Sequence, residues 1–230
     1  MQKVLIGFCV FVFVVLGYVL YTRTSALLVA GFSTNTIETP FYEMKITQPD
    51  NALKDFPELF AVTKNAITLF EKNYGNCEGE ECDRITPESL PYELQIDTTV
   101  ATTTKTVSYI VSLYEYTGGA HGITAIKTFT YDKKNKFIDE KAVFGESSWK
   151  PLVSNLTFEY LKAKLKDQTS DEVLKEGTSV VGSALDTWYL KDNDVVFVFG
   201  QYQVGPYVLG IQEVPIPREK LSEVLTHNFK

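Results

Sequence analysis

Close to its amino terminus the chain carries an uncharged apolar run that decides how the rest can be arranged. Residues 4–21 contain no Asp, Glu, Lys or Arg and are mostly aliphatic and aromatic. As a helix this run would be about 27 Å long, close to the roughly 30 Å hydrocarbon core of a bilayer. Tyr18 and Tyr21 fall where an interfacial aromatic belt would be. We therefore expect residues 1–23 to form a membrane anchor, with the remainder of the chain outside the cytoplasm.

A cleaved signal peptide is the alternative interpretation of this segment. Lys3 supplies a short positive region, and residues 24–26 (Thr-Ser-Ala) resemble a small-residue cleavage site. The apolar run is longer than the 7–15 residues typical of a signal peptide, which favours the anchor. Only three residues precede the run, so we expect no cytoplasmic domain. We expect residues 24–39 to be a linker and residues 40–230 to be one extracytoplasmic domain.

The pattern of side chains in this domain predicts an α+β fold, an antiparallel sheet with a few packing helices. Apolar residues at steps of three and four predict a helix over 56–74, with Asp55 as its N-cap, Pro57 in its first turn and Gly75 at its end. Strands are expected where the period changes to two, and short polar turns between them predict a meander. The expected strands cover residues 41–46, 93–100, 107–113, 125–131, 188–190, 195–199 and 209–214. Further helices are expected after Ser147 and Ser148, over 171–176, and after Pro217.

Two of the three cysteines flank a polar loop. Cys77 and Cys82 are separated by Glu78-Gly79-Glu80-Glu81. In an exported chain such a pair predicts a disulfide that closes a surface loop. A zinc site would need two more ligands, and the spacing of the acidic residues is not that of an EF-hand calcium loop. The third, Cys9, follows Phe8 rather than a small residue, so lipidation is not expected.

The charge and the motifs narrow the kinds of partner and chemistry. The formal net charge is −7, which disfavours nucleic acid and anionic lipid. It either favours cationic partners or, as the simpler interpretation, only keeps the domain soluble. The sequence lacks nucleotide-binding signatures, metalloprotease motifs and a nucleophile elbow. We therefore expect no cofactor, no metal site, no catalytic residue and no enzyme activity.

Two glycine-containing segments supply the candidate ligand-binding residues. His121 stands in Gly118-Gly119-Ala120-His121-Gly122, where three glycines predict a tight connection between strands. Tyr202 and Tyr207 flank a Gly205-Pro206 corner, and tyrosine is a frequent anchor in protein and glycan recognition. Each has a structural alternative. His121 could serve only the turn, and the two rings could simply pack the corner onto the sheet.

These same segments resemble motifs of a known family. The Gly-Gly-Ala-His sequence at 118–121, the Tyr-Gln-Val-Gly-Pro-Tyr sequence at 202–207, and Ile216-Pro217 followed by Leu221 are similar to the extracytoplasmic domain of RsiV anti-sigma factors. That domain also occurs at the amino-terminal side of PdaC-type peptidoglycan deacetylases. The resemblance covers about residues 40–225, with Gly205 in place of the usual Ala.

The resemblance implies an α+β domain of a bacterial cell envelope that binds or senses a ligand. It implies a protein partner, a cationic lysozyme in the case of RsiV itself, or peptidoglycan. Tyr202, Pro206, Tyr207 and His121 are the ligand-binding candidates. Two alternatives stay open: a peptidoglycan-acting enzyme that uses His121 with a carboxylate elsewhere in the chain, and a structural envelope protein.

Overall fold

The computed structural model describes residues 31–75, 91–146 and 148–230. The expected anchor and all three cysteines lie outside the described residues, so the membrane span and the Cys77–Cys82 disulfide stay predictions. In the part of the chain that the structure describes, no helix is long and apolar enough to cross a membrane.

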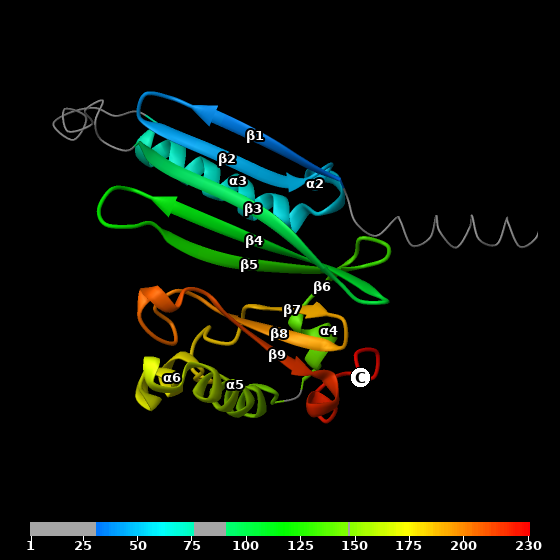
Figure 1. The fold of residues 1–230 in the computed structure, drawn as a ribbon. Coiled ribbons are helices and arrows are strands. Elements are labelled where there is room, and N and C mark those ends of the chain that lie inside the picture. The colour runs from blue at the N-terminus through cyan, green and yellow to red at the C-terminus, as the bar shows by residue number, and fades with distance from the viewer. Residues whose placement is uncertain (1–30, 76–90, 147) are drawn as a thin grey trace, which may run out of the picture. The chain divides into compact units, whose positions relative to one another are not determined.

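The described residues form two β-sheets and several helices, which confirms the α+β class (Figure 1). The larger sheet has the order β1-β2-β3-β4-β5-β6, and the smaller has the order β7-β8-β9. The strands of the larger sheet are β1 (Phe32–Glu38), β2 (Tyr42–Pro49), β3 (Tyr92–Thr102), β4 (Thr106–Tyr116), β5 (Ile123–Asp132) and β6 (Phe137–Ile138). The consecutive strands β3 to β6 pair antiparallel, as the sequence predicts for a meander.

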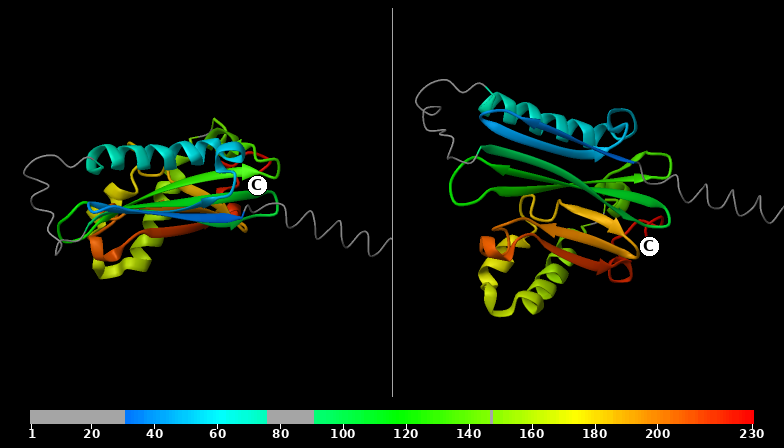
Figure 2. Two further views of the ribbon diagram at one scale, coloured as in Figure 1. Left: turned by 90° about the horizontal axis from the view of Figure 1, so that it is seen from above. Right: turned by 45° about the horizontal axis from the view of Figure 1, so that its top comes forward.

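The pairing of β2 with β3 departs from the expected all-antiparallel sheet. These strands run parallel, with Tyr42 opposite Tyr92 and Ile46 opposite Ile96. Helices α2 (Ala52–Asp55) and α3 (Pro57–Tyr74) lie between them in the chain. A parallel pair requires such a crossover, because the chain must return to the end from which it started. Figure 2 shows α3 against one face of this sheet.

The ends of α3 correct one expectation and confirm two. Asp55 does not cap α3, because it is the last residue of α2; the N-cap is Phe56, without a side-chain cap bond. Pro57 begins the helix, where its missing N–H costs nothing. Gly75 ends it and donates its backbone N–H to the Glu71 carbonyl at 2.7 Å.

The residues expected to be a linker contain an edge strand. β1 lies within residues 24–39 and pairs along its whole length with β2. All seven of its side chains are exposed, so it has no alternation of buried and exposed positions. Backbone hydrogen bonds rather than side-chain burial hold this strand, and the sequence pattern therefore did not predict it.

The smaller sheet carries its own core. Its strands are β7 (Trp188–Lys191), β8 (Asp194–Phe199) and β9 (Gln212–Pro217), which begins later than the expected strand at 209–214. It packs with α4 (Glu140–Phe144), α5 (Lys150–Leu165) and α6 (Asp171–Gly177). α5 has Trp149 rather than Ser148 as its N-cap, and Ser147 is not described. The segment after Pro217 is only a 3₁₀ turn, η4 (Arg218–Leu221).

Side-chain hydroxyl groups connect β7 to the larger sheet. The Leu190 N–H donates to Ser108 Oγ at 3.2 Å, and that hydroxyl lies 3.1 Å from the Leu190 carbonyl. Thr128 Oγ1 donates to the Trp188 carbonyl at 2.6 Å. Ser108 is fully buried. These bonds satisfy backbone groups of β7 on the side that faces the larger sheet.

Candidate ligand-binding surface

The turn that carries His121 connects β4 to β5 and depends on glycine at three positions. Gly118 and Gly119 have φ values of +92° and +96°, which side chains rarely adopt. A Cβ on Gly122 would lie 2.5 Å from the Tyr114 ring and 2.6 Å from the Glu115 carbonyl oxygen. The turn therefore has the tight form that its sequence predicts, and it presents an exposed His121.

The second segment is the loop between β8 and β9, residues 200–211. Tyr202 has a left-handed φ of +65° and is 55% exposed. Pro206 is exposed and precedes the short 3₁₀ turn η3 (Tyr207–Leu209), in which Tyr207 is half-buried. Figure 1 shows this loop and the β4–β5 turn at the same end of the two sheets.

The two segments meet through aromatic rings. The His121 ring stacks on Tyr207 with ring centroids 3.8 Å apart and an interplanar angle of 20°. Tyr202 lies beside both, with its ring centroid 6.4 Å from that of His121 and 5.6 Å from that of Tyr207. Three of the four ligand-binding candidates thus form one cluster, and Pro206 adjoins it in the chain.

Hydrogen bonds fix the orientation of the His121 ring. Nδ1 lies 3.1 Å from the Gly122 carbonyl oxygen, and Nε2 lies 3.3 Å from the Tyr202 hydroxyl. The Tyr207 hydroxyl donates to the same Gly122 carbonyl at 3.0 Å. For a neutral ring, this pattern selects the tautomer that carries its proton on Nδ1, with Nε2 accepting from Tyr202.

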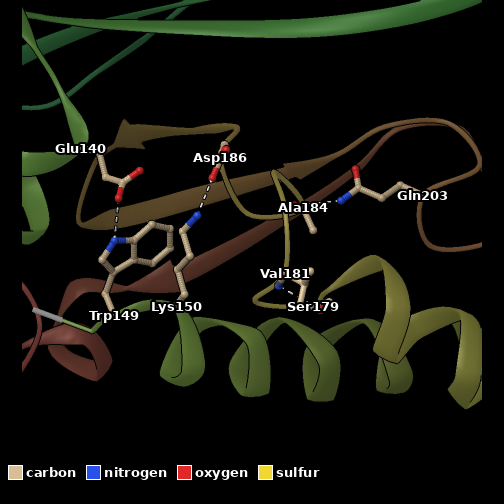
Figure 3. A network of polar contacts seen from close by, with 8 residues as sticks. All are labelled: Glu140, Trp149, Lys150, Ser179, Val181, Ala184, Asp186 and Gln203. Carbon is tan, nitrogen blue, oxygen red and sulfur yellow. Dashed lines mark hydrogen bonds and ion pairs between the residues drawn. The ribbon is translucent and has the colours of Figure 1, made fainter.

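Gln203 anchors the loop on the side away from His121. Its Nε2 donates to the carbonyl oxygens of Gly177 and Ala184, both at 2.9 Å, and its Oε1 accepts the Gly200 N–H at 2.9 Å. Figure 3 shows the Gln203–Ala184 bond beside the Lys150–Asp186 ion pair. Ala184 and Asp186 both belong to the segment between α6 and β7, so the ion pair connects the start of α5 to this same segment. The loop is therefore held from both sides, by Gln203 and by the His121 contacts.

A pocket of about 500 Å³ adjoins His121, and the sequence did not indicate it. Glu43, Glu93, Tyr114 and Tyr116 line it together with His121 and its turn. Glu43 and Glu93 are neighbours because β2 and β3 are parallel. A second hollow of about 550 Å³ lies between α3 and β3–β5 and is lined mostly by aliphatic side chains.

In the described ranges, no group of three or more His, Cys, Asp or Glu side chains is placed to hold a metal ion.

Two family models match this α+β domain, and each covers a segment that supplies one side of the aromatic cluster. Residues 34–124, which include His121, match the family model described as deacetylase PdaC. Residues 142–219, which include Tyr202 and Tyr207, match the model described as a protein of unknown function, DUF3298. The resemblance drawn from the sequence motifs is confirmed.

Two bacterial proteins are similar to this chain in sequence, in agreement with these matches. The chain is 28% identical over 182 residues to the peptidoglycan-N-acetylmuramic acid deacetylase PdaC of Bacillus subtilis, over 78% of this chain and 37% of that protein. It is 24% identical over 211 residues to the anti-sigma-V factor RsiV of the same strain, over 88% of this chain and 64% of RsiV. The chain thus spans about a third of one relative and just under two thirds of the other.

A solved structure shows the same fold. The crystal structure of a DUF3298 family member from Bacteroides fragilis superposes with a TM-score of 0.57 and 20% identity, over 88% of this chain and 96% of that one. At this identity the likeness concerns the fold alone.

Proposed function

We propose that this chain is a binding or sensing domain of a bacterial cell envelope, held outside the cytoplasm by its apolar amino-terminal segment. Its ligand surface is the cluster of His121, Tyr202 and Tyr207, with Pro206 beside it. The ligand is a protein, for which a cationic lysozyme is the candidate, or peptidoglycan.

The observation that carries this proposal is the convergence of two distant segments on one exposed aromatic cluster. The stack of His121 on Tyr207 joins the β4–β5 turn to the β8–β9 loop. Tyr202 adds an exposed ring and a hydroxyl. Rigid, partly exposed tyrosines provide large contact areas at low entropic cost, which is why they are frequent in binding surfaces.

The similarity to RsiV supports a sensing role, and the acidic charge supports a basic partner. RsiV-type domains imply lysozyme as the ligand, and a net charge of −7 attracts a cationic protein through a field that salt screens. Affinity that depends on shape and aromatic contact should survive physiological salt. Charge attraction alone should not.

The similarity to PdaC supports a second candidate, a peptidoglycan-acting enzyme that uses His121 with a carboxylate, for which Glu43 and Glu93 of the same pocket are the candidates. In this structure the two ring nitrogens of His121 contact a backbone carbonyl and a phenol. These two contacts hold the ring in place, which suits a fixed binding residue. A structural envelope protein is the third alternative, and the lack of any saturable ligand would favour it.

Calorimetric titration of the full-length chain in nonionic detergent with a c-type lysozyme tests the proposal. We expect saturable binding at physiological salt that is lost in Tyr207→Ala and retained in Tyr160→Ala, a matched change at a tyrosine of α5 that is 39% exposed. Peptidoglycan fragments, titrated in the same way and assayed for release of acetate, test the glycan and the enzyme alternatives. Heat that vanishes with salt, or that is equal in both variants, contradicts the proposal for lysozyme.

A further inference from the structure

The pocket beside His121 lies on the face of the larger sheet opposite α3. Leu94 and Leu113 line the hollow beneath α3, whereas Glu93 and Tyr114 line the His121 pocket. Adjacent residues of a strand point to opposite faces, so the two hollows belong to opposite sides of the same strands. The pocket therefore opens on the side that carries the His121–Tyr207 cluster.

Two carboxylates stand side by side in this pocket. Glu43 of β2 is the register partner of Glu93 of β3, and both side chains are half-buried. Neighbouring strands are about 4.8 Å apart, so two like charges lie close together, an arrangement that is unfavourable without a counter-charge. The ion pairs found among the described side chains are Lys141–Glu146, Lys150–Asp186 and Lys162–Asp171, which involve neither carboxylate.

Other charged and polar groups lie beside the two carboxylates, among them Glu38 of β1, which is the register partner of Glu43. Gln95 Nε2 donates to Glu93 Oε1 at 2.5 Å, which orients that carboxylate without neutralising it. Lys45 is two residues from Glu43 on β2 and is exposed. It does not line the pocket.

Aromatic rings form the remaining walls, and the glycine-rich turn holds them in place. The Tyr116 hydroxyl donates to the Gly119 carbonyl at 3.1 Å, and the Tyr114 ring packs directly over Gly122. Tyrosine faces attract cations through their quadrupole, and this attraction adds to that of nearby carboxylates. The walls are thus set before any ligand arrives, which lowers the entropic cost of binding.

We propose that this pocket binds one guanidinium or ammonium group, presented by an arginine or lysine side chain of a basic protein ligand. The paired carboxylates of Glu43 and Glu93 receive the positive charge, and the rings of Tyr114 and Tyr116 enclose the aliphatic stem. Arginine fits best, because its planar fork donates to two carboxylates at once. This inference rests on the proposed function in one respect, that the ligand which covers the aromatic cluster is a protein.

Small-molecule probes test the pocket without any protein ligand. N-acetyl-arginine amide is titrated into the full-length chain in nonionic detergent at constant physiological salt, with N-acetyl-citrulline amide as the uncharged near-isostere. We expect saturable binding of the arginine probe alone. Glu43→Gln and Glu93→Gln should each weaken it at least about tenfold, because each removes a charge-assisted contact. Asp97→Asn, which removes the same charge from β3 four residues beyond Glu93 and outside the pocket, should leave it unchanged.

Four results overturn the pocket assignment: no binding of the arginine probe, equal binding of citrulline, an equal effect of Asp97→Asn, or complete displacement of the probe by Ca²⁺ at equal concentration. The lysozyme titration separates this inference from the proposed function. If lysozyme binds and both glutamine variants bind it as tightly as the unmodified chain does, the function stands and the pocket assignment fails. If the arginine probe binds and lysozyme does not, the pocket stands and lysozyme is not the ligand.

Discussion

Replacing Gln203 with alanine should lower the free energy of unfolding by about 1.5–4.5 kcal/mol. The side chain makes three hydrogen bonds, to the carbonyls of Gly177 and Ala184 and from the N–H of Gly200. A net contribution of about 0.5–1.5 kcal/mol for each bond gives this range, since alanine leaves all three backbone groups without their partner. The loop that carries Tyr202 and Tyr207 would lose its anchor, so ligand affinity should fall as well.

Urea denaturation followed by circular dichroism measures this loss as a lower midpoint with an unchanged slope. Gln201→Ala is the matched control, because Gln201 makes one such bond, accepting the Thr124 N–H at 2.8 Å. It should cost about 0.5–1.5 kcal/mol. Gln203→Glu keeps the acceptor for Gly200 but directs a carboxylate at two carbonyl oxygens, so it should cost at least as much as alanine. A loss below about 0.5 kcal/mol for Gln203→Ala, or one no greater than that for Gln201→Ala, would refute the anchoring role.

Three further changes test other parts of the structure. Ser108→Ala removes the hydroxyl that bonds the backbone of Leu190 between the sheets, and urea denaturation should show a loss of about 1–3 kcal/mol; an unchanged midpoint would contradict this. Burial, with the Glu58 carboxylate adding to it, raises the pKa of the Tyr131 phenol above its ordinary value of 10.0. The folded state therefore holds this proton more tightly, and stability that is intact below about pH 10 is lost as the pH rises further. As the pH rises above about 10, Tyr131→Phe should lose less stability than the unmodified chain, and parallel curves would show that the Tyr131 phenol plays no part. Gly122→Ala places a Cβ 2.6 Å from the Glu115 carbonyl oxygen, so the turn must shift. Proton NMR should then show loss of the upfield ring-current shift that Tyr207 causes in the His121 ring. An unaltered spectrum would disprove the close approach of Gly122 to the Glu115 backbone.

Local patterns predicted most of the individual elements, because their signals are confined to short stretches of sequence. The apolar spacing along residues 57–74 and the alternation along β3 each reflect burial on one face, which periodicity reports directly. β1 escaped prediction because none of its side chains is buried. The division into two sheets was not visible either, since it depends on which strands exchange backbone hydrogen bonds.

The candidate surface could be predicted in its members but not in its geometry. Glycine and tyrosine motifs singled out His121, Tyr202 and Tyr207 separately, yet nothing local to either segment indicates that the rings stack. Glu43 and Glu93 carried no signal at all. Each is an ordinary polar position of a strand, and only the parallel pairing of β2 with β3 makes them neighbours.

In the proposed function, the β4–β5 turn and the β8–β9 loop form one ligand surface. Amide hydrogen exchange of the full-length chain, with and without saturating lysozyme, tests it most directly. We expect slower exchange in both residues 117–122 and residues 200–211, with α5 unchanged. Protection in only one of these segments, protection centred on α5, or no change at all would contradict it.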